Sequence, residues 1–191
     1  MSVRSQEILK ELRLTPLWRH RVEKPVNSIA KTPNSSVTKK EDRNFQILHS
    51  DWAQLEENVA SCTSCSLCQD RTKTVFGAGD KNADWLIVGD VPSAEEDTQG
   101  DPFIGLSGKL LDNMLEAVNL KRSSNIYIAN IVKCGPSGNR SLDNSEVQQC
   151  EPFLIRQIEL IKPKLIIVLG EIAAQNLLGT SATIDLSLIH I

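Results

Sequence analysis

The chain of 191 residues lacks any run of 18 or more apolar residues, roughly the length that a helix needs to cross a membrane. Its N-terminus, MSVRSQEILKELRL, alternates charged residues with leucine and lacks the apolar block of a secretory signal. No internal repeat is evident, which argues against a repeat architecture. We therefore expect a cytoplasmic protein that does not bind membranes, and we expect a monomer.

Cysteine is scarce as well, and its number is odd. The five cysteines cannot all pair with one another, and a reducing cytoplasm disfavours disulfides in any case. Metal binding is therefore the better interpretation of these residues.

The chain also lacks an excess of basic residues. Its 21 Lys and Arg stand against 24 Asp and Glu, and residues 1–45 hold 10 of the basic but only 5 of the acidic residues. Residues 46–191 are left with 11 basic and 19 acidic residues, a net charge of −8. Contact with nucleic acid in this part would need a local basic patch, because a broad positive face is missing.

What the chain does have is enough apolar material for one substantial core, with 40% hydrophobic residues. We expect a basic, largely flexible extension at residues 1–45 and one folded domain at residues 46–191. Within the extension, residues 7–14 have the apolar spacing of a short helix. Residues 22–45 are polar and contain proline, which predicts a flexible linker, with weak DNA contact as an alternative role.

Apolar runs alternate with amphipathic stretches in the predicted domain. The runs WLIVG, NIYIANIV and KLIIVLG are typical of strands buried on both faces. One amphipathic stretch places Leu110, Leu111, Met114, Leu115 and Val118 on a single apolar stripe. This alternation predicts an α/β fold, a three-layer α/β/α sandwich with a mainly parallel central sheet. The predicted strands are residues 85–89, 125–132 and 164–170, and the predicted helices are residues 52–60, 109–120 and 145–161.

Four of the five cysteines come from distant parts of the chain. Cys62 and Cys65 form a C-x2-C pair, and Cys68 follows as a spare thiol. Cys134 and Cys150 arrive singly, 16 positions apart. Zinc sites built on C-x2-C usually close with a second near pair, whereas an iron–sulfur cluster accepts thiolates from separate loops. The spacing favours a cluster and leaves zinc, or unrelated buried thiols, as alternatives.

Two polar stretches follow predicted strands, where an α/β sheet places its ligands. The first, GDVPSAEEDTQGDPFIGLSGKLL, has consecutive carboxylates at residues 95–97, which form either part of a pocket or a solvated turn. Phe103 in this stretch either stacks on a planar ligand or packs on the neighbouring helix. The second, YIANIVKCGPSGNR, puts Asn130 near the end of a buried strand, where its amide can bind a ligand edge.

Together these segments resemble the iron–sulfur (family 4) uracil-DNA glycosylases. The resemblance rests on FGAGDKNADWLIVGD, EEDTQGDPFIGLSGKLLDNML, YIANIVKCGPSGNR and PKLIIVLGEIAAQNLLG, and it runs from about residue 62 to residue 183. It implies a uracil-DNA glycosylase-like fold and a base-excision repair enzyme whose partner is DNA containing uracil. It also implies a structural 4Fe-4S cluster, without Cys68 as a ligand. The implied ligands are Cys62, Cys65, Cys134 and Cys150.

The reaction that the resemblance implies is hydrolysis of the N-glycosidic bond of uracil, after the base has been flipped out of the stack. Phe103 would stack on the uracil, Val91 would contact it, and Asn130 would read its N3 and O4 edge. Asp90 and Glu96 would help to place a water on the sugar carbon, where positive charge develops.

The resemblance also implies contacts with DNA phosphates. Ser107 and Lys109, at the start of a helix, would provide two of the donors, and Asn139 and Arg140, in a later loop, would provide the others. The alternative is a non-catalytic iron–sulfur protein that binds DNA or a replication partner.

The chain departs from the family pattern at two places. The family's usual turn is Gly-Glu-Ala-Pro-Gly or Gly-Glu-Gly-Pro-Gly, whereas residues 89–93 are GDVPS, with Asp90 as a shorter carboxylate. The family continues into a His-Pro loop that stabilises the departing uracil, whereas this chain ends in TIDLSLIHI. We therefore expect a chain that is truncated at its C-terminus and lacks the last strands, with a non-native end from about Leu186. Weak or absent activity is expected for it.

Overall fold

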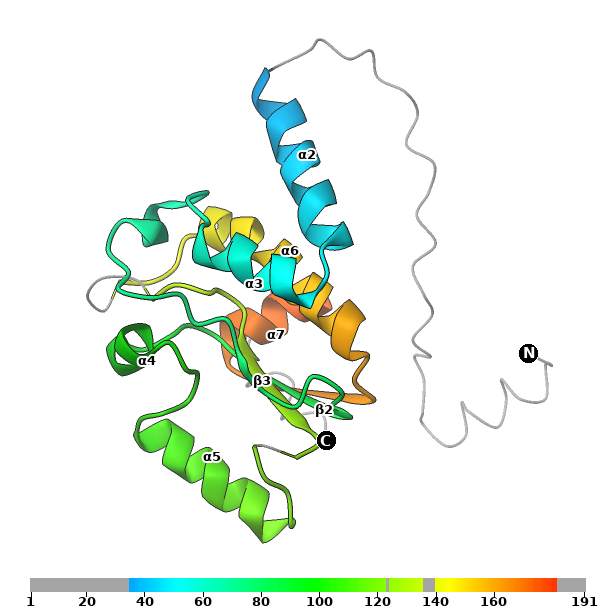
Figure 1. The fold of residues 1–191 in the computed structure, drawn as a ribbon. Helices are drawn as coiled ribbons and strands as arrows, with labels where there is room; N and C mark the ends of the chain where they lie inside the picture. Colours follow the sequence, from blue (N-terminus) through cyan, green and yellow to red (C-terminus); the bar gives the residue numbers. More distant parts are fainter. Residues whose placement is uncertain (1–34, 123, 136–139, 182–191) are drawn as a thin grey trace, which may run out of the picture. The chain divides into compact units, whose positions relative to one another are not determined.

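The computed structural model describes residues 35–122, 124–135 and 140–181 (Figure 1). Its elements are α2 (Ser35–His49), α3 (Trp52–Ala60), the 3-10 helix η1 (Ser66–Cys68), β1 (Ala78–Gly79), β2 (Trp85–Gly89), α4 (Ala94–Gln99), α5 (Leu106–Ala117), β3 (Ile126–Asn130), α6 (Asn144–Ile161), β4 (Leu165–Leu169) and α7 (Glu171–Leu178). None of these described helices has both the length and the apolar composition of a membrane span.

The strands in the described residues form one mixed sheet in the order β1-β3-β2-β4. β2 is parallel to β3 on one side and to β4 on the other, and β1 is antiparallel to β3. Gly89 at the end of β2 is level with Asn130 of β3 and Leu169 of β4. The carboxyl ends of the three parallel strands therefore meet at one edge of the sheet, and their predicted positions are confirmed to within two residues at each end.

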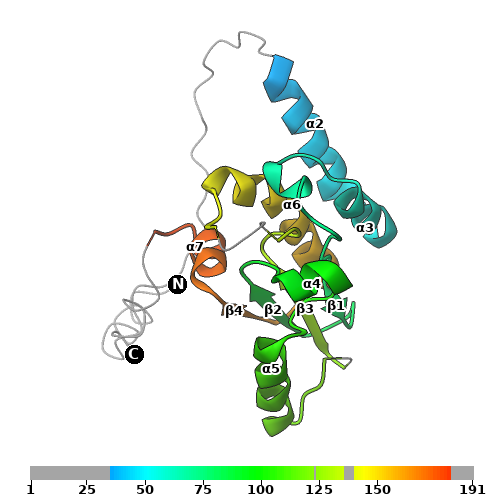
Figure 2. The ribbon, with the colours of Figure 1, turned by 90° about the vertical axis from the view of Figure 1, so that its left-hand side faces the viewer.

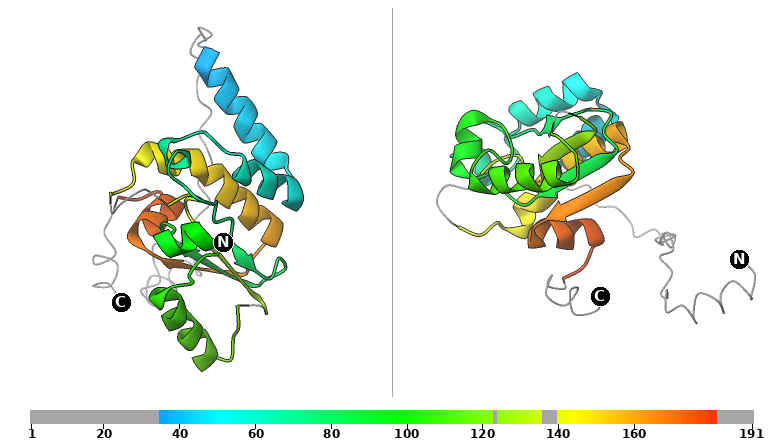
Figure 3. Two further views of the ribbon diagram at one scale, coloured as in Figure 1. Left: turned by 60° about the vertical axis from the view of Figure 1, so that its left-hand side comes forward. Right: turned by 90° about the horizontal axis from the view of Figure 1, so that it is seen from below.

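Helices cover both faces of this sheet (Figure 2). Leu111 and Leu115 of α5 pack on one face, together with Ile87 and Ile128 of the strands. The other face belongs to a larger core that includes Phe153 of α6 and residues of α2, α3 and α7. Figure 3 shows the same layers from two further sides. The predicted three-layer α/β/α sandwich with a mainly parallel sheet is confirmed.

Capping boxes fix where three of the helices begin. In each box, the N-cap side chain accepts a hydrogen bond from the third helical residue, whose own side chain accepts one from the N-cap amide. The pairs are Asp51 with Gln54 in α3, Ser93 with Glu96 in α4, and Asp143 with Glu146 in α6. Two carboxylates, those of Glu96 and Glu146, are thereby held at helix starts close to predicted site residues.

The prediction of a flexible linker at residues 22–45 is wrong from Ser35 onward. There α2 begins, and this helix packs against α6. Ile47 of α2 is only 2% exposed and belongs to the larger core. Burial of one helix face can stabilise a helix whose polar composition alone would not predict it. Residues 22–34 and the helix predicted at residues 7–14 lie outside the described residues.

The apolar stripe predicted for α5 is also only partly buried. Leu111 and Leu115 face the sheet, whereas Leu110, Met114 and Val118 are 61%, 57% and 60% exposed. The sheet contacts one line of residues on this helix, and the other three side chains lie on the neighbouring line.

β4 is likewise not buried on both faces, as the sequence had predicted. Leu165, Ile166 and Leu169 are 44%, 37% and 36% exposed. In the described residues β4 pairs with β2 alone, so it forms an edge of the sheet.

Candidate functional site

Asn130 lies at the carboxyl end of β3 and is almost completely buried, with 1% of its surface exposed. Its Nδ2 donates to Oε2 of Glu96, 3.2 Å away, and both residues are buried. A carboxylate oxygen can only accept, so Glu96 fixes which end of the Asn130 amide faces it. The amide oxygen is consequently directed elsewhere.

Phe103 approaches Asn130 across the end of β2, because Gly89 has no side chain there. A Cβ atom at Gly89 would lie 2.5 Å from Oδ1 of Asn130 and 2.7 Å from two ring atoms of Phe103. Phe103 is half-buried and packs against the smaller core, which includes residues of the strands and Leu111 of α5. An aromatic ring and the oxygen of an oriented amide thus flank the same glycine.

The backbone of Phe103 is in the left-handed region, with φ +54°, which is unusual for a residue other than glycine. Arg122, which follows α5 in the chain, holds this conformation. It donates to the carbonyl oxygens of Pro102 at 3.0 Å, of Gly108 at 3.1 Å and of Phe103 itself, and it pairs with Asp112. Sequence reasoning missed Arg122, because no local pattern connects it with a residue 19 positions earlier.

Asp90 follows β2 and lies at the start of α7. Its Oδ1 accepts a hydrogen bond from the backbone N–H of Ala173, at 2.7 Å. Gly170, the N-cap of α7, provides no side-chain cap, and a Cβ atom there would collide with the Asp90 carboxylate. Asp90 therefore acts as the cap of α7. No hydrogen bond among the described residues joins it to Glu96 or Asn130.

The remaining predicted pocket and phosphate residues are spread over several elements. Val91 is half-buried and packs against the larger core, next to Asp90. Ser107 and Lys109 are exposed in the first turn of α5. Asn139 lies outside the described residues.

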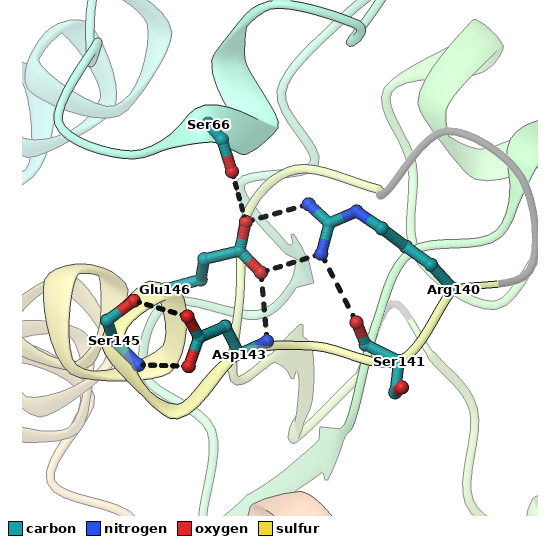
Figure 4. A network of polar contacts seen from close by, with 6 residues as sticks. All are labelled: Ser66, Arg140, Ser141, Asp143, Ser145 and Glu146. Atoms are coloured by element: carbon teal, nitrogen blue, oxygen red, sulfur yellow. Dashed lines mark hydrogen bonds and ion pairs between the residues drawn. The ribbon is translucent and has the colours of Figure 1, made fainter.

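Arg140 forms an ion pair with Glu146 (Figure 4). Its two terminal nitrogens lie 2.9 and 2.7 Å from the two carboxylate oxygens. The same carboxylate accepts from the hydroxyl of Ser66 in η1 and, at 3.0 Å, from the backbone N–H of Asp143. Arg140 above all, then Ser66 and Asp143, lower the pKa of Glu146 to about 2. The Glu146 carboxylate thus connects η1, directly after Cys65, with Arg140 and the start of α6.

The four cysteines that the sequence singled out belong to one region of the larger core. Cys134 and Cys150 are buried in it, and Cys62 and Cys65 pack against it, all as free thiols. Burial raises the pKa of Cys65 and Cys134, and the nearby charge of Cys62 raises both further. Burial, together with the charges of Cys134 and Cys65, raises the pKa of Cys150 to about 12. The thiols are thus close enough to oppose one another's ionisation.

Three donors reach the sulfur atoms of this cysteine site. Arg43 of α2 donates to Cys62 at 3.5 Å, Arg71 donates to Cys134 at 3.2 Å, and a backbone N–H donates to Cys150 at 3.4 Å. Burial opposes ionisation of Cys62, but bonds from Ser64 and Arg43 lower the pKa of its thiol overall.

The donor set fits an anionic group held by thiolates. Two guanidinium groups compensate for negative charge, and Nη1 of Arg43 is buried without a hydrogen-bond partner among the described residues. Such an orphaned donor is what a bound anionic group would satisfy. Within the same residues, no group of three or more His, Cys, Asp or Glu side chains is arranged to hold a metal ion.

Lys133 connects the cysteine site with Asn130, a role that its position in the sequence did not reveal. Its Nζ is fully buried and donates to the carbonyl oxygen of Asn130 at 3.0 Å and to Oε1 of Gln157 at 2.7 Å. Its backbone N–H is the donor to Cys150. Burial lowers the pKa of Lys133 to about 8, although the charges of Cys150 and Cys134 oppose this shift.

Comparison with known proteins shows to which family the chain belongs. Residues 76–190 match the model of the uracil DNA glycosylase superfamily. The chain is 42% identical over 117 residues to the type-4 uracil-DNA glycosylase of Archaeoglobus fulgidus, 40% over 128 residues to that of Pyrobaculum aerophilum, and 40% over 119 residues to that of Thermotoga maritima. These alignments cover 61%, 67% and 62% of this chain, and 58%, 65% and 62% of the relatives. The chain therefore spans about three fifths of the length of these relatives, and it belongs to the uracil DNA glycosylase superfamily.

Proposed function

We propose that this chain carries the base-binding part of a uracil-DNA glycosylase, a repair enzyme that hydrolyses the N-glycosidic bond of uracil in DNA. The observation that carries this proposal is the meeting of the Phe103 ring and the Asn130 amide over Gly89, with Glu96 orienting the amide. A planar apolar surface beside one directed amide suits a flat base with a single edge to be read. The name shared by the relatives supports the same substrate.

The base must leave the duplex before it can enter this site, because neither its edge nor the sugar carbon is accessible within the stack. Phe103 would then stack on the flipped ring. Asn130 would accept from N3–H of uracil through Oδ1 and donate to O4 through the second hydrogen of Nδ2. Cytosine presents the opposite pattern, an acceptor at N3 and a donor at N4, so the orientation that Glu96 imposes selects uracil.

Cleavage of the bond between base and sugar leaves positive charge on the sugar carbon, which a nearby carboxylate stabilises while it orients the attacking water. Glu96 and Asp90 are the candidates, and Val91 would line the pocket beside Asp90. Since Asp90 uses one oxygen to cap α7, only its second oxygen would be available for the water. The products would be free uracil and an abasic deoxyribose.

We infer that Cys62, Cys65, Cys134 and Cys150 hold a 4Fe-4S cluster and that Cys68 stays outside the ligand set. When bound, such a cluster would cross-link the C-x2-C turn, the segment after β3 and α6, as a structural element. The charge interactions among the thiols and the orphaned Arg43 nitrogen support it.

The proposed DNA contacts are Ser107 and Lys109 at the start of α5 and Asn139 and Arg140 after Cys134. Arg140 would have to share its guanidinium between Glu146 and a phosphate, because both nitrogens already contact the carboxylate. The monomeric state and a location in the cytoplasm, at the nucleoid, stay predictions.

A single-turnover assay tests the glycosylase function. The purified chain is incubated with a labelled oligonucleotide that contains one uracil, and abasic sites are revealed by alkaline cleavage. We expect weak but detectable product from the uracil strand, none from a matched thymine strand, and a further loss with Asn130→Ala. Absence of product from a folded sample that also fails to bind the uracil strand in preference to the thymine strand would refute the proposal.

A second candidate function is DNA binding without catalysis, and the capping role of Asp90 favours it. A carboxylate committed to the α7 N-terminus is poorly placed to activate water. Equal affinity for uracil-containing and uracil-free DNA, together with no turnover, would establish this alternative in place of the glycosylase.

A further inference from the structure

Arg43 lies in α2, before the residues that the superfamily model matches, yet it reaches the cysteine site. One of its terminal nitrogens, Nη2, donates to Sγ of Cys62 at 3.5 Å and to the backbone carbonyl of Gln149 at 3.2 Å. The guanidinium also lies over the ring of Phe153, 5.1 Å from its centre. One side chain thus contacts the C-x2-C turn and the residue immediately before Cys150.

Docking of α2 on the domain does not require the charge of Arg43. Docking is already provided by Ile47, which is 2% exposed in the core, and by Arg156 of α6, whose Nε donates to the carbonyl of Ser50 at 2.7 Å. Neither of these residues has a described contact with a cysteine. Arg43 is half-buried, and its Nη1 is buried without a partner among the described residues, which is costly unless another group accepts from it.

We propose that Arg43 is a positioning residue of the cysteine site, through which α2 forms one wall of the metal centre. Its Nη2 donates to the sulfur of Cys62, and its unpartnered Nη1 would donate to the bound group. N–H···S bonds to ligand sulfurs stabilise added negative charge, so they raise the reduction potential and retain the ligand. This inference rests on the proposed cluster.

The test uses the full chain, purified without oxygen, as wild type, Arg43→Gln, Arg43→Lys and the control Arg156→Gln. Arg156→Gln weakens the contact of α6 with Ser50, the residue that follows α2, but leaves the cysteines untouched. Iron and sulfide content, loss of visible absorbance under an iron chelator, and midpoint potential are measured, with far-ultraviolet circular dichroism to verify folding.

We expect Arg43→Gln to lose its chromophore roughly 10-fold faster than wild type, the lower end of what removal of a partner of a metal ligand costs, and to shift to a more negative potential. Arg43→Lys should fall between the two, because it keeps the charge but not the two-pronged geometry. Arg156→Gln should behave like wild type.

Two results would overturn the inference while the cluster itself stands. One is an Arg43→Gln protein with wild-type chromophore loss and potential, and the other is equal acceleration in Arg43→Gln and Arg156→Gln, which would show that only docking of α2 matters. A folded wild type without iron and sulfide would instead remove the cluster and this inference together.

Discussion

Replacement of Glu96 by glutamine should weaken discrimination between uracil and cytosine far more than it weakens binding of uracil. In the native protein, a flip of the Asn130 amide would break its bond to Oε2 of Glu96 and set two oxygens against each other. A hydrogen bond to a charged partner contributes about 1.5–3 kcal/mol. The flipped amide, the one that matches cytosine, is therefore disfavoured by roughly 10- to 100-fold.

Glutamine has almost the same shape but offers both a donor and an acceptor. It can bond to either orientation of Asn130, although the backbone N–H of Ser93, which donates to the same oxygen of Glu96 at 3.4 Å, still favours the native one. The flipped orientation therefore becomes more populated without equalling the native one. We expect a loss of uracil affinity of less than about 2-fold and a fall of the uracil-to-cytosine ratio by roughly 5-fold or more.

The assay compares binding of two oligonucleotides that differ only by uracil or cytosine at one position, with a 2′-fluorine on that sugar to slow cleavage. A ratio of dissociation constants removes any effect common to both bases. Glu95→Gln is the matched control, because it removes the same charge from an exposed neighbour. A wild-type ratio in Glu96→Gln, with binding otherwise intact, would refute the proposed orienting role.

Three further substitutions test other parts of the structure. Arg122→Gln frees the backbone around Phe103, and we expect roughly 10- to 100-fold weaker binding of uracil-containing DNA, from the loss of about 1.5–3 kcal/mol of charged hydrogen bonding. Glu146→Gln removes the ion pair with Arg140. This pair lowers the pKa of Glu146 to about 2 in the folded protein, against about 4.3 in the unfolded chain. Its contribution to the free energy of unfolding is therefore present above about pH 4.3 and is lost as the pH falls toward about 2. The difference in unfolding free energy between wild type and Glu146→Gln, measured in urea, should therefore shrink over that pH range. Gly170→Ala should lower the unfolding free energy by about 1–3 kcal/mol or more, because φ at this position is +149° and the new Cβ meets Asp90.

Each of these substitutions has a control in the same chain. Lys121→Gln changes an exposed cation next to Arg122, and equal binding losses in both would contradict the role of Arg122. Glu116→Gln removes an exposed carboxylate, and a pH dependence like that of Glu146→Gln would contradict the ion-pair argument. Gly179→Ala places a Cβ at positive φ in open space, so an equal loss there would show that backbone strain alone, without Asp90, explains Gly170→Ala.

Sequence patterns predicted the features whose causes are local. The run WLIVG is continuously apolar and ends at a glycine, and β2 has the bounds that this pattern predicted. The start of α6 at Asn144 was predicted to within one residue and is likewise local, since the capping box of Asp143 spans only four residues. α2 escaped prediction because its sequence is polar and its stability depends on packing against α6, which follows about a hundred residues later.

In the candidate site, too, locally unusual residues were predicted, whereas contacts between distant residues were not. Asn130 and Phe103 stood out because a buried amide and a ring among turn residues are locally unusual. The role of Asp90 was not predictable, because its partner Ala173 lies 83 positions away and contributes only a backbone N–H. The same holds for the contact of Arg122 with Phe103, 19 positions apart, where the acceptor is a carbonyl group that every residue possesses.

Asn130 and the cysteine site are connected by the segment that leads out of β3. Only three residues separate Asn130 from Cys134, and Lys133 among them bonds both to the Asn130 carbonyl and, through its backbone, to Cys150. A displacement of Cys134 or Cys150 would therefore move Lys133, whose Nζ donates to the backbone carbonyl of Asn130. The Asn130 amide in turn is held by Glu96 on a separate helix, so a shift at the strand end would strain the bond that orients it. A bound cluster would thus support base recognition through backbone geometry alone, without taking part in any chemical step.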